Sequence, residues 1–278
     1  MKNTVNNDTQ DAQPKQSHGK VWLVGAGPGD PELLTMRAHR VIQSADVVLY
    51  DHLISQAVID LIPATAQDFF VGKPFGCKQR VAQSHIHALM IRFAKEHKAV
   101  VRLKSGDPLI FGRGGEEMAA LQQAGIEFEV VPGITAASAC ASAAKISLTH
   151  RDYAQTLSLC TGHTREGSTA IDAVHQHQKT YVFYMGIHNV EAICEHLMSN
   201  EQQPGSRAAC IVENGSQRNQ RIFSTTLAQL AHTVKVQGVC SPALLIVGDV
   251  TQSAQSSQLS QGYTHNFSLG ATPQEAAQ

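Results

Sequence analysis

The stretch Val24-Gly25-Ala26-Gly27-Pro28-Gly29-Asp30 separates an apolar segment from an amphipathic one. Residues 20–24, which precede the glycines, have the composition of a buried strand. After the glycines, Leu34, Ala38 and Val41 recur at helical spacing. Because glycine carries no side chain, a small ligand can approach the main chain closely at such a turn. The stretch therefore predicts a ligand-binding loop between the first strand and the first helix.

The spacing of these glycines argues against a dinucleotide as the ligand. The dinucleotide fingerprint has glycine at its first, third and sixth positions, and counting from Gly25 the sixth position is Asp30. An acid there would repel a pyrophosphate, and Pro28 removes an amide donor. Asp30 followed by Pro31 is instead typical of a helix start, with the acid as N-cap. A glycine turn without any ligand stays an alternative for this motif taken alone.

Composition sets limits on the class of protein. The chain has 278 residues, enough for one large domain or two of ordinary size. Its 22 basic and 23 acidic residues predict no general attraction to nucleic acid or to an anionic membrane. Residues 1–18 lack the apolar centre of a signal peptide, so we expect a cytoplasmic protein. The six cysteines form no Cys-x-x-Cys pair, which favours small buried residues over disulfides or metal ligands.

The pattern of apolar residues predicts two α/β domains between two disordered tails. Polar segments without an apolar period cover residues 1–18 and 251–278. Between them strands and helices alternate, and up to residue 131 this alternation favours a parallel sheet covered by helices. We expect an N-terminal domain over 19–131, a linker with an interdomain helix over 132–150, and a C-terminal domain over 151–250.

Individual elements follow from the same pattern. Strands are predicted at 20–24, 47–50, 69–71, 99–103, 126–131, 155–161, 180–184, 207–213, 221–224 and 243–247. Helices are predicted after Asp30 and at 86–93, 116–124, 136–144, 169–177, 190–198 and 226–234. The first-domain strands end in Gly25–Asp30, Asp51, Lys73 and Ser105–Pro108. Ligands of open α/β sheets bind at the carboxyl ends of the strands, so we expect these loops to form one site.

In this order the loops resemble those of the tetrapyrrole methylases. The matching segments are Val24–Asp30 with Leu33–Thr35, Tyr50-Asp51, Val71–Lys73, Val101–Pro108, Phe111–Glu117, Val131–Ala136, Leu148–Asp152, Thr161–His163 and Tyr184–Gly186. The resemblance extends over about residues 19–250. The opening loop is common to the wider family, whereas Phe111–Glu117 and Thr149–Asp152 are similar to the branch that methylates uroporphyrinogen III.

The resemblance implies a class III methyltransferase fold, with a mainly parallel sheet in the first domain and a mixed sheet in the second. It implies a metal-free homodimer that binds S-adenosylmethionine between the domains and releases S-adenosylhomocysteine. Two methyl transfers would convert uroporphyrinogen III through precorrin-1 to precorrin-2, which leads to sirohaem and cobalamin. Some relatives carry a dehydrogenase/ferrochelatase domain ahead of this unit, for which we expect the 18-residue tail to be too short.

Three other functions remain open from the sequence. A related methylase would act at a different ring position of a tetrapyrrole. A nicotinamide-dependent oxidoreductase is suggested only by Gly25–Gly29. A non-catalytic protein that binds tetrapyrroles would keep the fold and lose the chemistry.

The resemblance assigns the contacts of the methyl donor to nine positions. They are Pro28, Ser105, Gly106, Asp107, Ile110, Thr135, Ala136, Met185 and Gly215. Ser105 stands where the family usually has glycine, so its hydroxymethyl group either crowds the donor or adds a hydrogen-bond donor. His52 and Ser147 replace a common arginine and a common proline.

Two further positions are assigned to proton transfer, Asp51 as acceptor and Lys73 as donor. Attack by a pyrrole carbon on the methyl group spreads positive charge over the ring, and a carboxylate can stabilise that charge and take the released proton. The alternative for Asp51 is a helix cap or a structural salt bridge. For Lys73 we favour pairing with a substrate carboxylate, because an unperturbed lysine holds its proton tightly at neutral pH. A solvated loop lysine is the other possibility.

The implied substrate carries eight carboxylates, so we expect a locally basic cleft. The candidates, besides Lys73, are Arg37, Lys104, Arg113 and Arg151. Each is equally able to pair with a nearby acid, as Arg113 with Glu116 or Glu117 and Arg151 with Asp152. The pairs His85/His87 and His175/His177 alternate on predicted helices and therefore point apart, which disfavours a metal site. His150 and His163 lie in matching segments as cleft donors of unassigned role.

Overall fold

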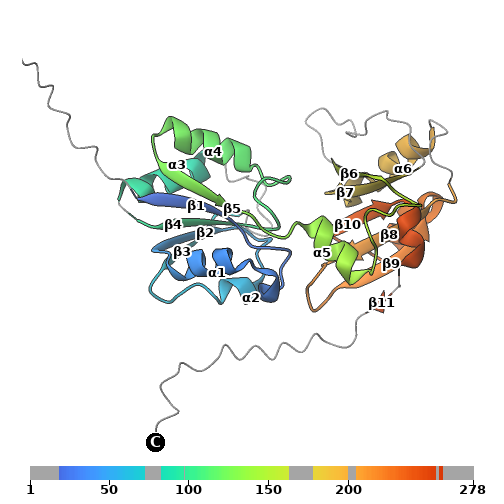
Figure 1. Ribbon diagram of the computed structural model, residues 1–278, viewed down its shortest axis with the longest axis horizontal. Coiled ribbons are helices and arrows are strands. Elements are labelled where there is room, and N and C mark those ends of the chain that lie inside the picture. Colours follow the sequence, from blue (N-terminus) through green and yellow to red (C-terminus); the bar gives the residue numbers. More distant parts are fainter. Residues whose placement is uncertain are drawn as a thin grey trace, which may run out of the picture.

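A computed structural model describes residues 19–72, 83–96, 98–162, 178–199, 205–254 and 257–258. It contains two β-sheets, one in each half of the chain, and the helix α5 (Ala136–Ala143) follows the connection between them (Figure 1). Several predicted features lie outside the described residues. These are Lys73, Cys77, His163, the helix at 169–177 with His175 and His177, the tail 1–18 and most of the tail after 254.

The first sheet is entirely parallel, as predicted. Its strands are β1 (Lys20–Gly25), β2 (Val47–Tyr50), β3 (Gln67–Phe70), β4 (Val100–Lys104) and β5 (Glu127–Val131). They lie in the order β3-β2-β4-β1-β5, which places β4 at the centre. The carboxyl ends of β1, β2 and β4 therefore meet at one edge, where the polar loops were expected to gather.

Helices cover both faces of this sheet (Figure 1). On one face α3 (Gln83–Lys95) and α4 (Gly114–Gln123) pack against alternate residues of the central strands, including Leu23 and Leu49. On the other face α1 (Met36–Gln43) and α2 (Gln56–Ile59) cover Val24, Val48 and Leu103. Strands buried on both faces need apolar residues at nearly every position, which explains the continuous apolar runs in the sequence.

The first helix begins later than the sequence indicated. Asp30 is the expected cap, since its Oδ1 accepts a hydrogen bond from the Glu32 N–H at 2.9 Å, but it caps only the 3₁₀-helix η1 (Pro31–Leu33). The backbone of Leu34 is extended and ends that turn. Thr35 then provides a second cap for α1, because its Oγ1 accepts from the Ala38 N–H at 3.1 Å.

The second sheet is mixed, as predicted. It consists of β6 (Thr156–Thr161), β7 (Lys179–Tyr184), β8 (Ala208–Glu213), β9 (Arg221–Thr226), β10 (Ala243–Val247) and β11 (Ser257–Gln258). The order is β11-β9-β8-β10-β7-β6, in which β6 and β7 are parallel and the other pairs antiparallel.

Helix α5 packs on one face of this sheet, against Val182, Val212 and Leu244. The opposite face is covered by α6 (Val190–Ser199) and α7 (Leu230–Val236). Short 3₁₀-helices precede both, η2 (Ile187–Asn189) and η3 (Leu227–Gln229). The predicted helix at 226–234 therefore begins as a 3₁₀ turn and becomes α-helical only at Leu230.

Two predictions at the C-terminal side need correction. Residue 251 does not begin an unstructured tail, because Thr251 lies in the 3₁₀-helix η4 (Asp249–Ser253) and is 2% exposed. Its Oγ1 donates to the Gly248 carbonyl at 2.7 Å, and β11 pairs with β9 beyond it. Cys240 is exposed, whereas the other four described cysteines are buried as expected. Among the described residues, no helix is long and apolar enough to cross a membrane.

Candidate active site

The loops at the carboxyl edge of the first sheet pack main chain against main chain. Gly27 and Gly106 exchange two backbone hydrogen bonds, N–H to O, of 3.2 and 2.7 Å. A Cβ on Gly133 would overlap the Gly106 carbonyl oxygen, and one on Gly25 would lie 2.5 Å from the Gly133 nitrogen. The close approach of three segments therefore requires glycine at Gly25 and Gly133, whereas Gly106 contributes the facing carbonyl and has a left-handed φ of 69°. We call these three residues the glycine seam (Gly25, Gly106, Gly133).

A cavity of about 560 Å³ opens beside this seam, and both halves of the chain line it. All nine positions assigned to the methyl donor lie in its wall, namely Pro28, Ser105, Gly106, Asp107, Ile110, Thr135, Ala136, Met185 and Gly215. Asp51 lines it as well. Residues from Pro28 to Gly215, which belong to loops of both halves, thus converge on one space.

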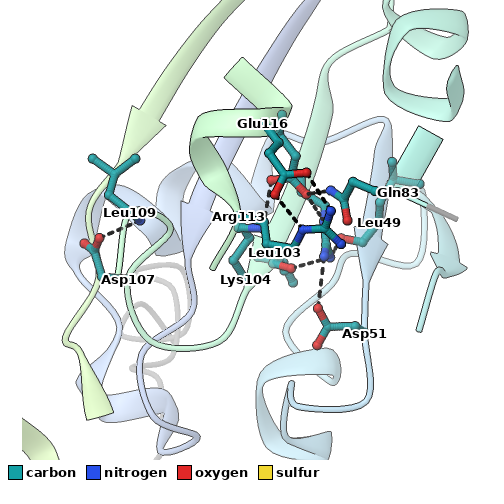
Figure 2. Close-up of polar contacts among 11 residues, drawn as sticks. Leu49, Asp51, Gln83, Leu103, Lys104, Asp107, Leu109, Arg113 and Glu116 are labelled. Atoms are coloured by element: carbon teal, nitrogen blue, oxygen red, sulfur yellow. Dashed lines mark hydrogen bonds and ion pairs between the residues drawn. The ribbon is translucent and has the colours of Figure 1, made fainter. Parts of the chain in front are cut away.

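Asp107 holds two of these loops together. Its Oδ1 accepts a hydrogen bond from the Leu109 N–H at 2.9 Å (Figure 2), and its Oδ2 accepts from the Gly133 N–H at 3.1 Å. The carboxylate therefore links the turn after β4 to the segment that precedes α5. Each oxygen keeps a second lone pair for a ligand donor.

Four charged side chains of the first half line the cavity and contact one another, and Figure 2 draws the polar contacts around Asp51 and Lys104 as dashed lines. Arg102 reaches the Asp51 Oδ2 with a terminal nitrogen at 2.9 Å and the Glu117 Oε1 with its Nε at 3.3 Å. Lys104 Nζ lies 2.8 Å from the other oxygen of Glu117. Gln83 donates to Glu117 Oε1 at 3.2 Å. We call Asp51, Arg102, Glu117 and Lys104 the charged quartet.

Burial makes this quartet an unusual arrangement. The side chain of Glu117 is 0% exposed and those of Arg102 and Lys104 are each 5% exposed, whereas Asp51 is 22% exposed toward the cavity. Two cations and two anions compensate one another, which is the condition under which buried charges are tolerated. Burial lowers the pKa of Lys104 below its usual 10.5, with Glu117 opposing the shift and Arg102 reinforcing it.

Arg102 and Glu117 were not among the predicted site residues. The signal was present in β4, where two cations at alternate positions interrupt an apolar strand and must therefore share one face. Arg102 also donates to the carbonyls of Leu103 at 2.7 Å and Leu49 at 3.4 Å, so its guanidinium is held on several sides. Asp51 therefore forms the structural salt bridge that was one of its alternatives, and it is also exposed to the cavity.

The opposite wall, mainly from the second half, carries aromatic and apolar groups, and Phe111 of the first half packs against it. The rings of Phe111 and Tyr184 have centroids 4.9 Å apart, and Met185 follows Tyr184 in the chain. Phe111 and Met185 have left-handed backbone angles, with φ of 52° and 53°. Such angles are uncommon for non-glycine residues and cluster at functional sites.

Further contacts join the first-half loops to one another and to the second half. The Asp30 N–H donates to the Ser216 Oγ at 3.3 Å, and the Ser55 Oγ donates to the Gly29 carbonyl at 2.5 Å. A Cβ on Gly29 would lie 3.0 Å from the side chain of Gln217, which also lines the cavity. The opening glycine loop therefore borders the cavity on the side of residues 214–217.

The expected basic residues are not all brought together. Arg113 lines the cavity and makes two ion-pair contacts with Glu116, of 2.8 and 2.6 Å. Lys104 also lines it but is paired with Glu117. Arg37 pairs with Glu129 outside the cavity, and Arg151 is exposed in a turn outside it. Of the four candidates described, only Lys104 and Arg113 line the cavity, so the predicted basic cleft does not include Arg37 and Arg151.

His150, which lies in a matching segment, is outside the cavity. His150 packs its ring against Tyr153, with centroids 4.7 Å apart, and its Nδ1 accepts from the Asp152 N–H at 3.2 Å. No cluster of three or more His, Cys, Asp or Glu side chains suited to a metal ion occurs within the described ranges.

Comparison with known proteins decides the family. Residues 20–231 match the model of the tetrapyrrole (corrin/porphyrin) methylases. The chain belongs to the tetrapyrrole methylase family. Its match to the family covers the whole first sheet and strands β6 to β9 of the second, so the tetrapyrrole methylase fold inferred from the motifs is confirmed.

Two kinds of relative are similar to this tetrapyrrole methylase. A sirohaem synthase of Thioalkalivibrio sulfidiphilus is 49% identical over 247 residues, which is 88% of this chain and 49% of the relative. The chain thus spans about half the length of the curated relatives it matches. Uroporphyrin-III C-methyltransferase of Thermus thermophilus is 35% identical with a TM-score of 0.73, over 86% of this chain and 100% of that one.

A second crystal structure of the Thermus thermophilus enzyme contains S-adenosylhomocysteine. It is 37% identical to this chain with a TM-score of 0.69, and the match covers 84% of this chain and 94% of that one.

Proposed function

We propose that the chain is an S-adenosylmethionine-dependent methyltransferase that converts uroporphyrinogen III through precorrin-1 to precorrin-2. The observation that carries the proposal is the convergence of all nine assigned donor positions on one cavity. The similarity to uroporphyrin-III C-methyltransferase, over the whole length of that enzyme, supports the choice of substrate. Precorrin-2 leads to sirohaem and cobalamin.

The residues of the cavity fit the methyl donor, whose sulfonium supplies a transferable methyl group without a metal. Main chain free of side chains at Gly106 lets the donor lie close to the loop after β4. Asp107 offers lone pairs to its ammonium group, and Thr135 and Ala136 line the cavity beside it. Ser105 adds a hydroxyl to the wall at the position where the family usually has glycine. A sulfonium carries no phosphate, so the absence of a dinucleotide fingerprint is consistent with this ligand.

Asp51 is our proposed proton acceptor. Arg102 holds one carboxylate oxygen and the Leu53 N–H donates to the other at 3.1 Å, so the group is fixed at the edge of the cavity. A fixed anion there stabilises the positive charge that develops on the pyrrole ring and then takes the released proton. Lys73 is our proposed proton donor or carboxylate partner.

For the carboxylates of the substrate we propose Arg113, which lines the cavity with a half-exposed side chain. We also propose a homodimer that works in the cytoplasm, with a first domain over 19–131, a linker over 132–150 and a second domain from residue 151. The five strands of the first sheet, which fall within 20–131, support this division.

The test is a turnover assay with uroporphyrinogen III and S-adenosylmethionine labelled at the methyl group. We expect two labelled methyl groups in the product and the mass of precorrin-2. Consumption of the donor with a differently methylated product would instead support a methylase for another ring position. No consumption of the donor would refute the proposal.

The variant Asp51→Asn tests the assigned base in the same assay. Removal of a general base typically costs 10²–10⁴-fold, so we expect kcat to fall by roughly 100-fold. Binding of S-adenosylhomocysteine, measured by calorimetry, should persist. Asp60→Asn is the matched control, because Asp60 accepts a hydrogen bond from the Gln56 side chain at 2.8 Å and does not line the cavity. Equal turnover by parent and Asp51→Asn would favour a binding protein or a different base.

A further inference from the structure

Tyr184, the last residue of β7, reaches from the second half of the chain to the first turn of α5. Its Oη lies 2.6 Å from the Thr135 Oγ1 and accepts a hydrogen bond from the Ala137 N–H at 3.0 Å. We propose that Tyr184 is a positioning residue that holds Thr135 and Ala136 in the geometry needed to bind the methyl donor. The inference rests on the proposed function, and it concerns a residue to which no role was assigned.

The first reason for assigning this role to Tyr184 is the way in which α5 begins. Thr135 occupies the N-cap position, yet its side chain makes no capping hydrogen bond to the helix. At the start of α1, by contrast, the corresponding Thr35 accepts from the Ala38 N–H at 3.1 Å. Helix starts leave N–H groups without partners, and in α5 the Tyr184 hydroxyl takes one of them. The Thr135 side chain is thereby released from capping and remains in the cavity wall.

The second reason is the number of hydroxyl protons that Tyr184 and Thr135 have available for hydrogen bonds. Tyr184 and Thr135 together carry two hydroxyl protons, and the bond between them uses one. The Ala137 N–H supplies its own proton, so it uses neither. One hydroxyl proton therefore remains to be donated from a pair that lines the cavity. A carboxylate or hydroxyl oxygen of the donor is the kind of acceptor that this group would serve.

The ring of Tyr184 is also fixed in place. Phe111 packs against it from the first half, with centroids 4.9 Å apart. Burial raises the pKa of the Tyr184 phenol above its usual 10, although the bonds to Thr135 and Ala137 oppose this shift, so the hydroxyl stays protonated at neutral pH. A protonated and immobile hydroxyl can orient its partners without the cost of ordering itself.

The variant Tyr184→Phe tests the inference, because it keeps the ring and removes the hydroxyl. Calorimetric titration with S-adenosylhomocysteine should give a Kd roughly tenfold higher than that of the parent, as expected for a buried hydrogen-bonded group. In turnover, the KM for S-adenosylmethionine should rise by a similar factor while kcat and the KM for uroporphyrinogen III change less than threefold. A Kd within twofold of the parent would overturn the inference, even if the unfolding temperature fell.

Tyr181→Phe is the matched control. Tyr181 lies three residues earlier on the same strand, and its ring belongs to the core on the opposite face. It should leave the Kd unchanged, and an equal loss of affinity in both variants would refute a specific role for Tyr184. If the parent itself does not bind S-adenosylhomocysteine, the proposed function fails rather than this inference.

A double-mutant cycle with Thr135→Val separates positioning from direct contact. If Tyr184 acts through Thr135, the losses of affinity in the two single variants should not add in the double variant. Full additivity would mean that the two hydroxyls act independently, which would contradict the proposed role.

Discussion

The two walls of the cavity are built from different chemistry. The first half contributes the charged quartet from β4, α4 and the loop after β2, and every side chain in it is an ion-pair partner. The second half contributes Tyr184, Met185 and apolar side chains such as Val212 and Leu244. The proposed reaction would move positive charge from a sulfonium to a pyrrole ring, which requires a polar wall to stabilise charge and an apolar wall to hold an organic group. Each half supplies one of them.

The topology explains this division. β4 is the central strand of the first sheet, so Arg102 and Lys104 cannot extend to solvent and require the buried Glu117. In the second half, the side chains that reach the cavity extend the core between α5 and the sheet. The first wall should therefore be sensitive to loss of charge, and the second to changes of volume.

The largest effect is expected when the charge of Glu117 is removed. Glu117→Gln leaves Arg102 and Lys104 as two buried cations facing only Asp51, and breaking a buried pair in this way typically costs about 3–5 kcal/mol. The free energy of unfolding in urea measures the loss. The neighbouring Glu116→Gln, which breaks the exposed pair with Arg113, should cost less than about 1 kcal/mol. Similar losses in both would mean that the quartet is not a special feature of this wall.

Glu213 is a buried carboxylate of the second half that does not line the cavity, and it can be compared with Glu117. Burial alone would raise the pKa of Glu213, but the ion pair with Arg221 and the Cys240 N–H, 2.7 Å away, hold that pKa below its usual 4.5. A lowered folded-state pKa stabilises the protein above pH 4.5, and this contribution is lost as the pH falls through the folded-state value.

The variant Glu213→Gln should therefore be less stable than the parent by about 1.5–3 kcal/mol at pH 7, the range for hydrogen bonds to charged groups. The difference should shrink as the pH is lowered below 4.5. Urea unfolding at a series of pH values measures it. A difference independent of pH would show that packing, not charge, is lost.

The apolar wall can be tested with substitutions that change the volume of a side chain. A Cβ on Gly215 would overlap the Sγ of Cys140, so Gly215→Ala should cost about 2 kcal/mol by overpacking. Cys140→Ala removes the obstructing sulfur, and the double variant should recover most of the loss. Thermal and urea unfolding of the four proteins form the cycle. If Cys140→Ala brings no recovery, the strain arises from the backbone of the loop instead.

The smallest effect is expected at the cavity rim. Arg113→Gln should raise the KM for uroporphyrinogen III about tenfold, which corresponds to about 1.4 kcal/mol, because one bidentate partner of a carboxylate is lost. The Kd for S-adenosylhomocysteine should not change. Arg92→Gln is the control, since Arg92 forms a similar exposed pair with Glu96 on α3. An unchanged KM in Arg113→Gln would remove Arg113 from the proposed substrate site.

The sequence predicted the elements whose signal is local. Strands such as β2 and β10 appear within a residue of the expected positions, because apolar runs bounded by polar turns are a strong signal. Helix α2 was missed, since four residues are too few to show a period. The start of α1 was predicted too early, because Asp30 and Thr35 are both good caps and only the extended Leu34 separates their helices.

For the candidate site, residues in family motifs could be predicted, whereas their ion-pair partners could not. The nine positions assigned to the methyl donor come from the family motifs, and the structure places all of them in the wall of one cavity. The partners of Asp51 were not found, because Glu117 reaches Arg102 only through the packing of α4 against β4, which local sequence does not encode. Arg37 was expected near the substrate, but its pairing with Glu129 of β5 depends on which strand neighbours β1.

The glycine seam has a consequence for redesign of the cavity. Gly25, Gly106 and Gly133 belong to three separate segments. A new Cβ on Gly25 or Gly133 would overlap main-chain atoms of another segment, and a new side chain on Gly106 would be strained by its left-handed φ of 69°. Main chain cannot be trimmed as a side chain can, so a compensating second substitution is unavailable at these positions. Attempts to change ligand preference should therefore vary the second-half wall, where neighbours such as Cys140 can be made smaller, and leave the seam intact.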